Sequence, residues 1–240
     1  MNKRTRVKSP VFSGDIFERN LGDFAQRDEM RDIKRQIERF GQLVEGLAEM
    51  REKPDPFKTQ AQINVEYGKR YEEALSAAKR SVEKSIERLV DAQDKARRNM
   101  IVKTKLDRVV PDAQEIRAHL RGMTDKQRRE FIAKSIDHGR FEVISAIVNT
   151  SLPELAGLTP ELVTQYQMAY VEKVAPEYLE EEKAIQTAEQ MLGMAFDSFR
   201  KQAEEMRDPH LEVEAIKMKE QADAADAAFK QALNADARAE

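Results

Sequence analysis

Histidines and acidic side chains are the residues of this sequence best suited to metal binding or acid–base chemistry. Glu115 and His119 are four residues apart, so a helix would place both on one face. Two ligands do not make a metal site, which needs three or four. Asp137 and His138 precede Gly139, a pattern typical of a helix C-terminus, where a histidine complements the exposed carbonyls. We therefore predict neither a metal site nor a catalytic residue here.

Other signatures of enzymes are missing from the sequence. It has no cysteine, no Gly-rich phosphate loop, no nucleophile elbow and no HExxH motif. The acids 180–182 fall in a charged run typical of a solvated helix face, and His210 follows a proline at an expected helix start. We predict that the protein is not an enzyme and that it uses no cofactor.

The composition favours long helices over a thick core. Of 240 residues, 40% are hydrophobic and only 6% aromatic, while Gly and Pro number 9 and 8. Few helix breakers and many Ala, Glu, Lys, Arg and Gln favour helices. We predict an elongated all-α fold, with long coiled-coil-like helical hairpins flanking a small cluster of short helices. Such a fold has too few large apolar residues to enclose a deep pocket.

Charge is distributed unevenly along the chain. Residues 1–150 carry a net charge of +7 and residues 151–240 a net charge of −10. This asymmetry indicates either head-to-tail self-association or separate partners for the two ends. No apolar run approaches the ~20 residues of a membrane helix, and no signal-peptide pattern follows the basic N-terminus. We expect no membrane contact and no secretion through a signal peptide.

Residues 1–22 are predicted to form an extended basic N-terminal arm. Pro10, Gly14 and Gly22 discourage a helix. Two interpretations stay open: a disordered terminus, or a segment that docks on another subunit or on nucleic acid. The residues that would dock are the aromatic pair Phe12 and Phe17, and the cations that would contact phosphate are Lys3, Arg4, Arg6 and Lys8.

Residues 23–110 are predicted to form a long helical hairpin. Its first helix, 23–52, has apolar residues at alternating steps of three and four, which predicts a seam buried against a facing helix of the same chain or of a neighbour. Prolines 54 and 56 end it, and the second helix runs over 57–107, with Gly68 as its expected weak point. We assign protein contacts to the first seam, formed by Met30, Ile33, Ile37, Phe40, Val44 and Leu47.

The densest basic segment is 95–108, with a net charge of +5. It is either a solvated helix face or a contact for phosphates or an acidic partner. Because no aromatics are interleaved, base stacking is not expected and any nucleic-acid contact would be independent of sequence. The candidate residues are Arg97, Arg98, Lys103 and Lys105.

Residues 111–175 are predicted to form a small helical cluster. Thr124 and Gln127 have the spacing of a capping box, and a helix beginning there should end at Gly139. The apolar run 141–148 favours a short helix, although its β-branched residues leave a strand open. Thr159 is expected to cap a further helix that ends near residue 174.

Residues 176–240 are predicted to form an acidic helical hairpin, broken at Pro209. Small residues on the seam of its second helix would let the two helices approach closely. That seam steps by four and three through Leu211, Ala215, Met218, Ala222, Ala225, Phe229 and Ala232.

The run 119–162 resembles a segment of uncharacterised proteins of tailed bacteriophages and prophages. The shared pattern is Met123-Thr124 before an Arg-rich helix, Asp137-His138-Gly139 followed by Phe141-Glu142, then Pro153 and the run 157–161, GLTPE. The resemblance covers about 44 residues and implies no chemistry. It implies a phage-encoded virion or assembly protein.

Together these patterns predict a non-enzymatic structural or assembly protein that acts through helix–helix contacts and its N-terminal arm. The resemblance points to a bacteriophage virion component of the internal head or core, connector or scaffold type, located in the virion or the host cytoplasm. Expected partners are the protein itself, as a homo-oligomer, and capsid, portal or internal virion proteins. The alternative is a nucleic-acid-associated protein that makes phosphate contacts through its basic N-terminal part.

Overall fold

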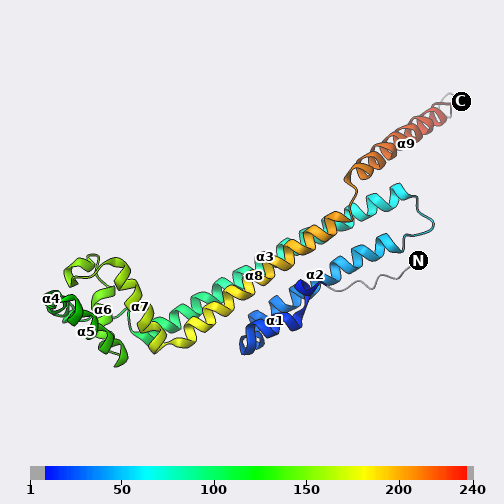
Figure 1. Ribbon diagram of the computed structural model, residues 1–240. Coiled ribbons are helices and arrows are strands. Elements are labelled where there is room, and N and C mark those ends of the chain that lie inside the picture. Colours follow the sequence, from blue (N-terminus) through cyan, green and yellow to red (C-terminus); the bar gives the residue numbers. More distant parts are fainter. Residues whose placement is uncertain (1–8, 237–240) are drawn as a thin grey trace. The chain divides into compact units, whose positions relative to one another are not determined.

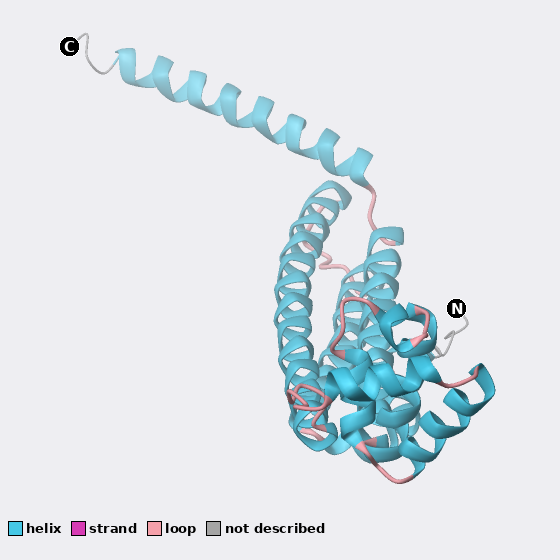
Figure 2. Ribbon diagram, turned by 90° about the vertical axis from the view of Figure 1, so that its left-hand side faces the viewer, coloured by secondary structure: helices cyan, strands magenta, loops and turns pink. Residues whose placement is uncertain are grey.

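The computed structural model describes residues 9–236, with side chains through residue 232. All regular structure within these residues is helical and no strand is present (Figure 2), so the predicted all-α class is confirmed. Among the described residues, no helix combines the length and the apolar character that crossing a bilayer requires.

Contacts divide the chain into two compact units. Unit 1 contains residues 9–86 and 188–236 as far as they are described, and unit 2 contains residues 87–187. We expected domain boundaries in the loops near residues 110 and 175. They lie instead inside the two longest helices, α3 (Gln60–Thr104) and α8 (Pro176–Glu205), because each of these helices contributes to the core of both units.

The start of the described chain folds onto α2 (Asp28–Glu52) rather than forming an extended arm. It forms a 3₁₀ turn, η1 (Pro10–Phe12), then α1 (Gly14–Leu21) and a second turn, η2 (Gly22–Gln26). The predicted extended arm is therefore wrong over residues 9–22. Ser13 caps α1 by accepting from the amide of Ile16, and burying one apolar face stabilises the helix that Gly14 was expected to discourage.

Helices α2 and α3 are antiparallel neighbours in unit 1 (Figure 1). Near the turn, the guanidinium of Arg51 lies 4.3 Å from the ring centre of Tyr67. Farther along, Ser81 of α3 donates to the side chain of Gln36 on α2. These contacts join two helices separated by the turn 53–59, as the prolines at 54 and 56 predicted.

The C-terminal half of α8 completes the unit 1 core. Phe40 of α2 packs against Phe196 and Phe199 of α8, with ring centres 6.0 and 5.8 Å apart. The Tyr67 hydroxyl donates to the carbonyl oxygen of Ala203 at 2.8 Å, so α8 contacts both α2 and α3. Buried alanines on α8 let the helices approach closely; they are Ala188, Ala195 and Ala203.

Unit 2 packs four short helices around the end of α3. These are α4 (Ala113–Gly122), α5 (Asp125–Asp137), α6 (Phe141–Val148) and α7 (Pro160–Val174), with a 3₁₀ turn, η3 (Pro153–Ala156), before the last. The capping box of Thr124 and Gln127 is confirmed. The run 141–148 is a helix and not a strand, and Thr159 caps α7.

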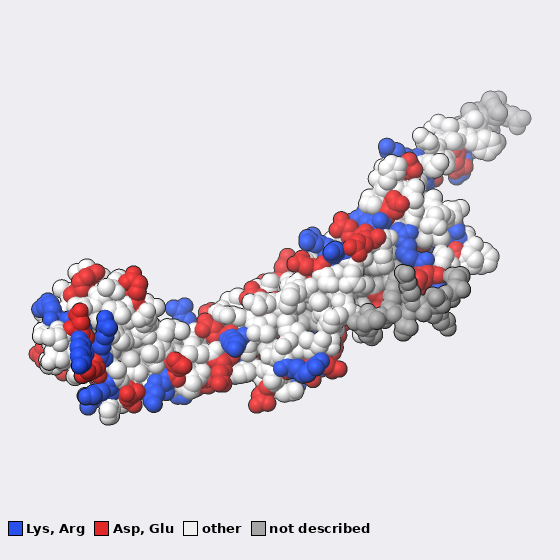
Figure 3. Space-filling model, viewed as in Figure 1, with Lys and Arg blue, Asp and Glu red and all other residues white. Residues whose placement is uncertain are grey.

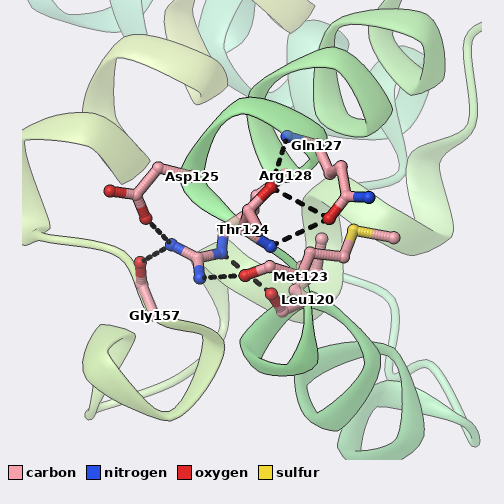
Figure 4. A network of polar contacts seen from close by, with 7 residues as sticks. All are labelled: Leu120, Met123, Thr124, Asp125, Gln127, Arg128 and Gly157. Carbon is pink, nitrogen blue, oxygen red and sulfur yellow. Dashed lines mark hydrogen bonds and ion pairs between the residues drawn. The ribbon is translucent and has the colours of Figure 1, made fainter.

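Arg128 joins three parts of unit 2 (Figure 4). Its Nε donates to the carbonyl oxygen of Leu120 at 2.8 Å and its Nη2 to that of Met123 at 3.0 Å, at the end of α4. Its Nη1 donates to the carbonyl of Gly157 and contacts Asp125. Only 9% of Arg128 is exposed. One guanidinium thus donates to three carbonyls, two at the end of α4 and one after η3.

Candidate functional site

The histidines are all held by local contacts. The exposed His119 ring lies edge-on to Phe131, with ring centres 5.6 Å apart. His138 Nδ1 lies 2.6 Å from the carbonyl oxygen of Lys134 at the end of α5. His210 Nδ1 lies 3.6 Å from a carboxylate oxygen of Glu214. Within the described residues, no three His, Asp or Glu side chains are placed to share a metal ion.

The α2 seam is part of the chain's own core and is closed to partners. Five of its residues are at most 5% exposed, and Val44 is half-buried. The assignment of these residues to contacts with other proteins is therefore wrong. The sequence left open whether the facing helix belongs to the same chain, and α3 and α8 provide that face. The five buried residues are Met30, Ile33, Ile37, Phe40 and Leu47.

The two aromatics predicted to dock on a partner also contact their own unit. Phe17 is fully buried. Phe12 is half-buried and lies against Gly41 of α2, where a Cβ would be 2.9 Å from that of Phe12. Their assignment as partner contacts is thus wrong for Phe17, and Phe12 retains only a partly exposed edge.

The four predicted phosphate-contacting cations that the structure describes, all within 95–108, do not converge on one surface. Lys103 pairs with Glu177, and the ammonium of Lys105 lies 5.4 Å from the ring centre of Phe141. Arg97 and Arg98 are exposed on α3, but at 100° per residue Arg98 and Lys103 point about 140° apart. On the face in Figure 3, basic and acidic side chains are interspersed over unit 2. Lys3, Arg4, Arg6 and Lys8 lie outside the described residues, so the phosphate-contact alternative stays a prediction.

The first turn of α9 (Pro209–Asp236) is held against α3 by ion pairs of the half-buried Arg207. Arg207 Nε lies 3.1 and 3.0 Å from the two carboxylate oxygens of Glu212, and its Nη1 lies 2.7 Å from an oxygen of Glu72 on α3. The hydrogen bond to Glu212 raises the pKa of Arg207 above its ordinary value. Glu212 is only 6% exposed and covers Gly68 of α3. These contacts hold the first turn of α9 against α3.

Beyond that turn, the apolar face of α9 packs on nothing in the described chain. Met218 is 69% exposed and Phe229 is 64% exposed. From residue 213 to residue 232 only Ala215 is even half-buried. The predicted hairpin packing of 176–207 with 209–232 is therefore wrong. In Figure 3 the visible surface of this helix is largely uncharged. We call Met218, Ala222, Ala225 and Phe229, with Ala215 and Ala232 at its ends, the α9 seam.

The α9 seam is the largest set of predicted apolar positions left uncovered within the described residues. Its alternating steps of three and four are those of a coiled-coil seam. An isolated helix gains little stability without packing of its amphipathic face, and this face has no packing partner among the described residues. The predicted neighbour of this face, the helix 176–207, does not cover it, and the seam itself stays a prediction.

Comparisons with known proteins found no matching family, no matching curated relative and no matching solved structure.

Proposed function

We propose that the protein is a non-enzymatic structural or assembly protein that engages other polypeptides through the α9 seam. The observation that supports this proposal is the exposure of Met218 and Phe229 on a coiled-coil face, 69% and 64%, while the other predicted seam, on α2, is buried in the same chain. A face with seam spacing that no described residue covers is suited to an intermolecular helix contact.

The chemistry of the seam fits a protein partner better than a small ligand. Its central positions are alanines, which allow a second helix to approach to about 8 Å. Phe229 and Met218 provide larger apolar contacts on either side of these alanines. A helix laid along this face would contact residues three and four apart, which is the general mode of helix recognition in proteins.

The proposal extends to a bacteriophage particle through the resemblance of residues 119–162. Within a particle, the proposed role is that of an internal head or core component, a connector or a scaffold. Capsid, portal and internal virion proteins are the proposed partners besides the chain itself.

Quantitative mass spectrometry of particles purified from cells that carry the gene tests this function. We expect the chain at a fixed copy number per particle. The double variant Met218→Glu, Phe229→Glu should be lost from particles while its circular dichroism stays that of the wild type, because both residues are exposed. Gln231→Glu adds a charge to the same helix outside the seam and should be incorporated normally. Absence of the wild-type chain, or unchanged incorporation of the double variant, would contradict the proposal.

A further inference from the structure

The α9 seam is symmetric in side-chain size about its own midpoint. Met218 and Phe229 lie equally far from the point midway between residues 223 and 224, and both are large. Ala222 and Ala225 are likewise equidistant and small. In a two-fold contact between identical helices, each residue of one copy meets its counterpart across the midpoint of the other, so the surface must be complementary to itself. The seam of α9 meets this requirement.

We propose that α9 pairs in antiparallel orientation with α9 of a second copy of this chain. In this arrangement Met218 packs on the second copy's Phe229, and Ala222 packs on the second copy's Ala225. A methionine sulfur beside an aromatic ring is a favourable contact, and the two central alanine layers bring the helices close together. The inference rests on the proposed function and adds the orientation and the register in which two copies of the chain pair.

Charge complementarity supports this pairing and fixes its register. Lys219 and Asp226 occupy the same flanking position of successive heptads. In the antiparallel register Lys219 faces the second copy's Asp226, so the contact contains two opposite-charge pairs. Sliding the pairing by one heptad would place Lys219 on Lys219 and Glu212 on Asp226, which is repulsive. Asp226 already pairs with Lys230 of its own helix at 2.7 Å, but its side chain stays 60% exposed.

The contacts of the first turn of α9 favour the antiparallel orientation. Glu212 is buried by its own unit, and Ala215 is half-buried. A parallel partner would bring a second folded unit to this same end, where the helix surface is already covered. Antiparallel pairing places the two folded units at opposite ends and uses the segment 218–229, which is exposed throughout.

Charge reversal in the full-length protein tests the pairing. Lys219→Asp or Asp226→Lys alone turns both pairs into like-charge contacts and should weaken dimerisation about tenfold. The double variant Lys219→Asp, Asp226→Lys restores both pairs and should recover the wild-type dissociation constant. Lys217→Asp makes the same charge change on the exposed face away from the seam and should have little effect. Sedimentation equilibrium over a concentration series measures all five proteins.

The possible outcomes separate this inference from the proposed function. A wild-type chain that is monomeric at about 100 µM overturns the self-pairing, and if the seam variant is still lost from particles, the proposed function stands. Weakening by both single variants without recovery in the double variant overturns the antiparallel orientation. A dimer whose double variant recovers supports the inference, even if the chain is absent from particles and the proposed function fails.

Discussion

The carboxylate of Glu212 occupies the space that a side chain at position 68 would fill. A Cβ built on Gly68 would lie 2.6 Å from the Glu212 carboxyl carbon. Gly68 was expected to be the weak point of its helix, but α3 continues through it. The first turn of α9 approaches α3 so closely that only glycine fits at position 68 unless the Glu212 carboxylate moves. Arg207 holds the carboxylate of Glu212 in this place.

Gly68→Ala and Gly46→Ala should therefore differ in stability. Gly46 is exposed inside α2 with nothing within 4 Å of a built Cβ, so alanine there should stabilise the protein by about 1 kcal/mol. Gly68→Ala should not show this stabilisation, because the new methyl group would displace the Glu212 carboxylate from Arg207. Urea unfolding followed by circular dichroism measures both. Equal stabilisation by the two substitutions would show that Glu212 moves aside at no cost.

Arg128→Ala should destabilise unit 2 by about 3 kcal/mol, because it removes the guanidinium hydrogen bonds to the carbonyls of Leu120, Met123 and Gly157. Arg128→Lys should recover only part of the loss, since one ammonium cannot reproduce the planar fork. The exposed neighbour Arg129 is the control, and Arg129→Ala should change stability by less than about 0.5 kcal/mol. The same urea titrations give the values, and similar effects at 128 and 129 would contradict the structural role of Arg128.

The stability of unit 1 should fall in alkaline solution through Tyr67. Complete burial raises the pKa of its hydroxyl to about 12, whereas in the unfolded chain it is about 10. The part of the unfolding free energy that comes from this pKa difference is fully present below pH 10. It is lost as the pH rises toward 12, because Tyr67 ionises at lower pH in the unfolded chain than in the folded one. The loss should reach about 2 kcal/mol. Urea unfolding of wild type and Tyr67→Phe between pH 8 and 12 tests this. Parallel declines of the two proteins would exclude Tyr67 as the cause.

Side-chain truncation should lower the unfolding free energy strongly on the α2 seam and hardly at all on the α9 seam. Phe40 is fully buried against Phe196 and Phe199, so Phe40→Ala should cost unit 1 about 3–5 kcal/mol. Phe229 is exposed, and Phe229→Ala should leave the unfolding free energy of the monomer within about 0.5 kcal/mol. Thermal unfolding at low protein concentration compares the two. A large loss at Phe229 would mean that the chain itself covers the α9 seam.

Helix positions could be predicted from the sequence because they depend on local signals. The capping box at Thr124, the glycine stop at 139 and the prolines at 54 and 209 act within a few residues of the chain. The spacing on α2 likewise showed which face is buried. Periodicity shows that a face is buried but not which element covers it. The residues from Met30 to Leu47 were therefore assigned to a partner, whereas α3 and α8 of the same chain cover them.

The site required information that no local pattern contains. The α9 seam is visible in the spacing of Met218, Ala222, Ala225 and Phe229, but spacing does not show whether another part of the chain covers it. Arg128 could not be identified either, because one of its acceptors, Gly157, is 29 residues away. Phe17 was misassigned because Pro10, Gly14 and Gly22 predict an extended segment. Burial of one apolar face is enough to stabilise α1 there.

Photo-crosslinking from position 229 in producing cells tests the central claim most directly. A photoreactive phenylalanine analogue replaces Phe229 in one protein and Gln231, on the same helix outside the seam, in another. We expect a discrete crosslinked product from position 229, at about twice the chain's mass if the partner is a second copy, and a much weaker product from position 231. No crosslinked product from 229, or equal products from both positions, would contradict the claim that the α9 seam binds another polypeptide.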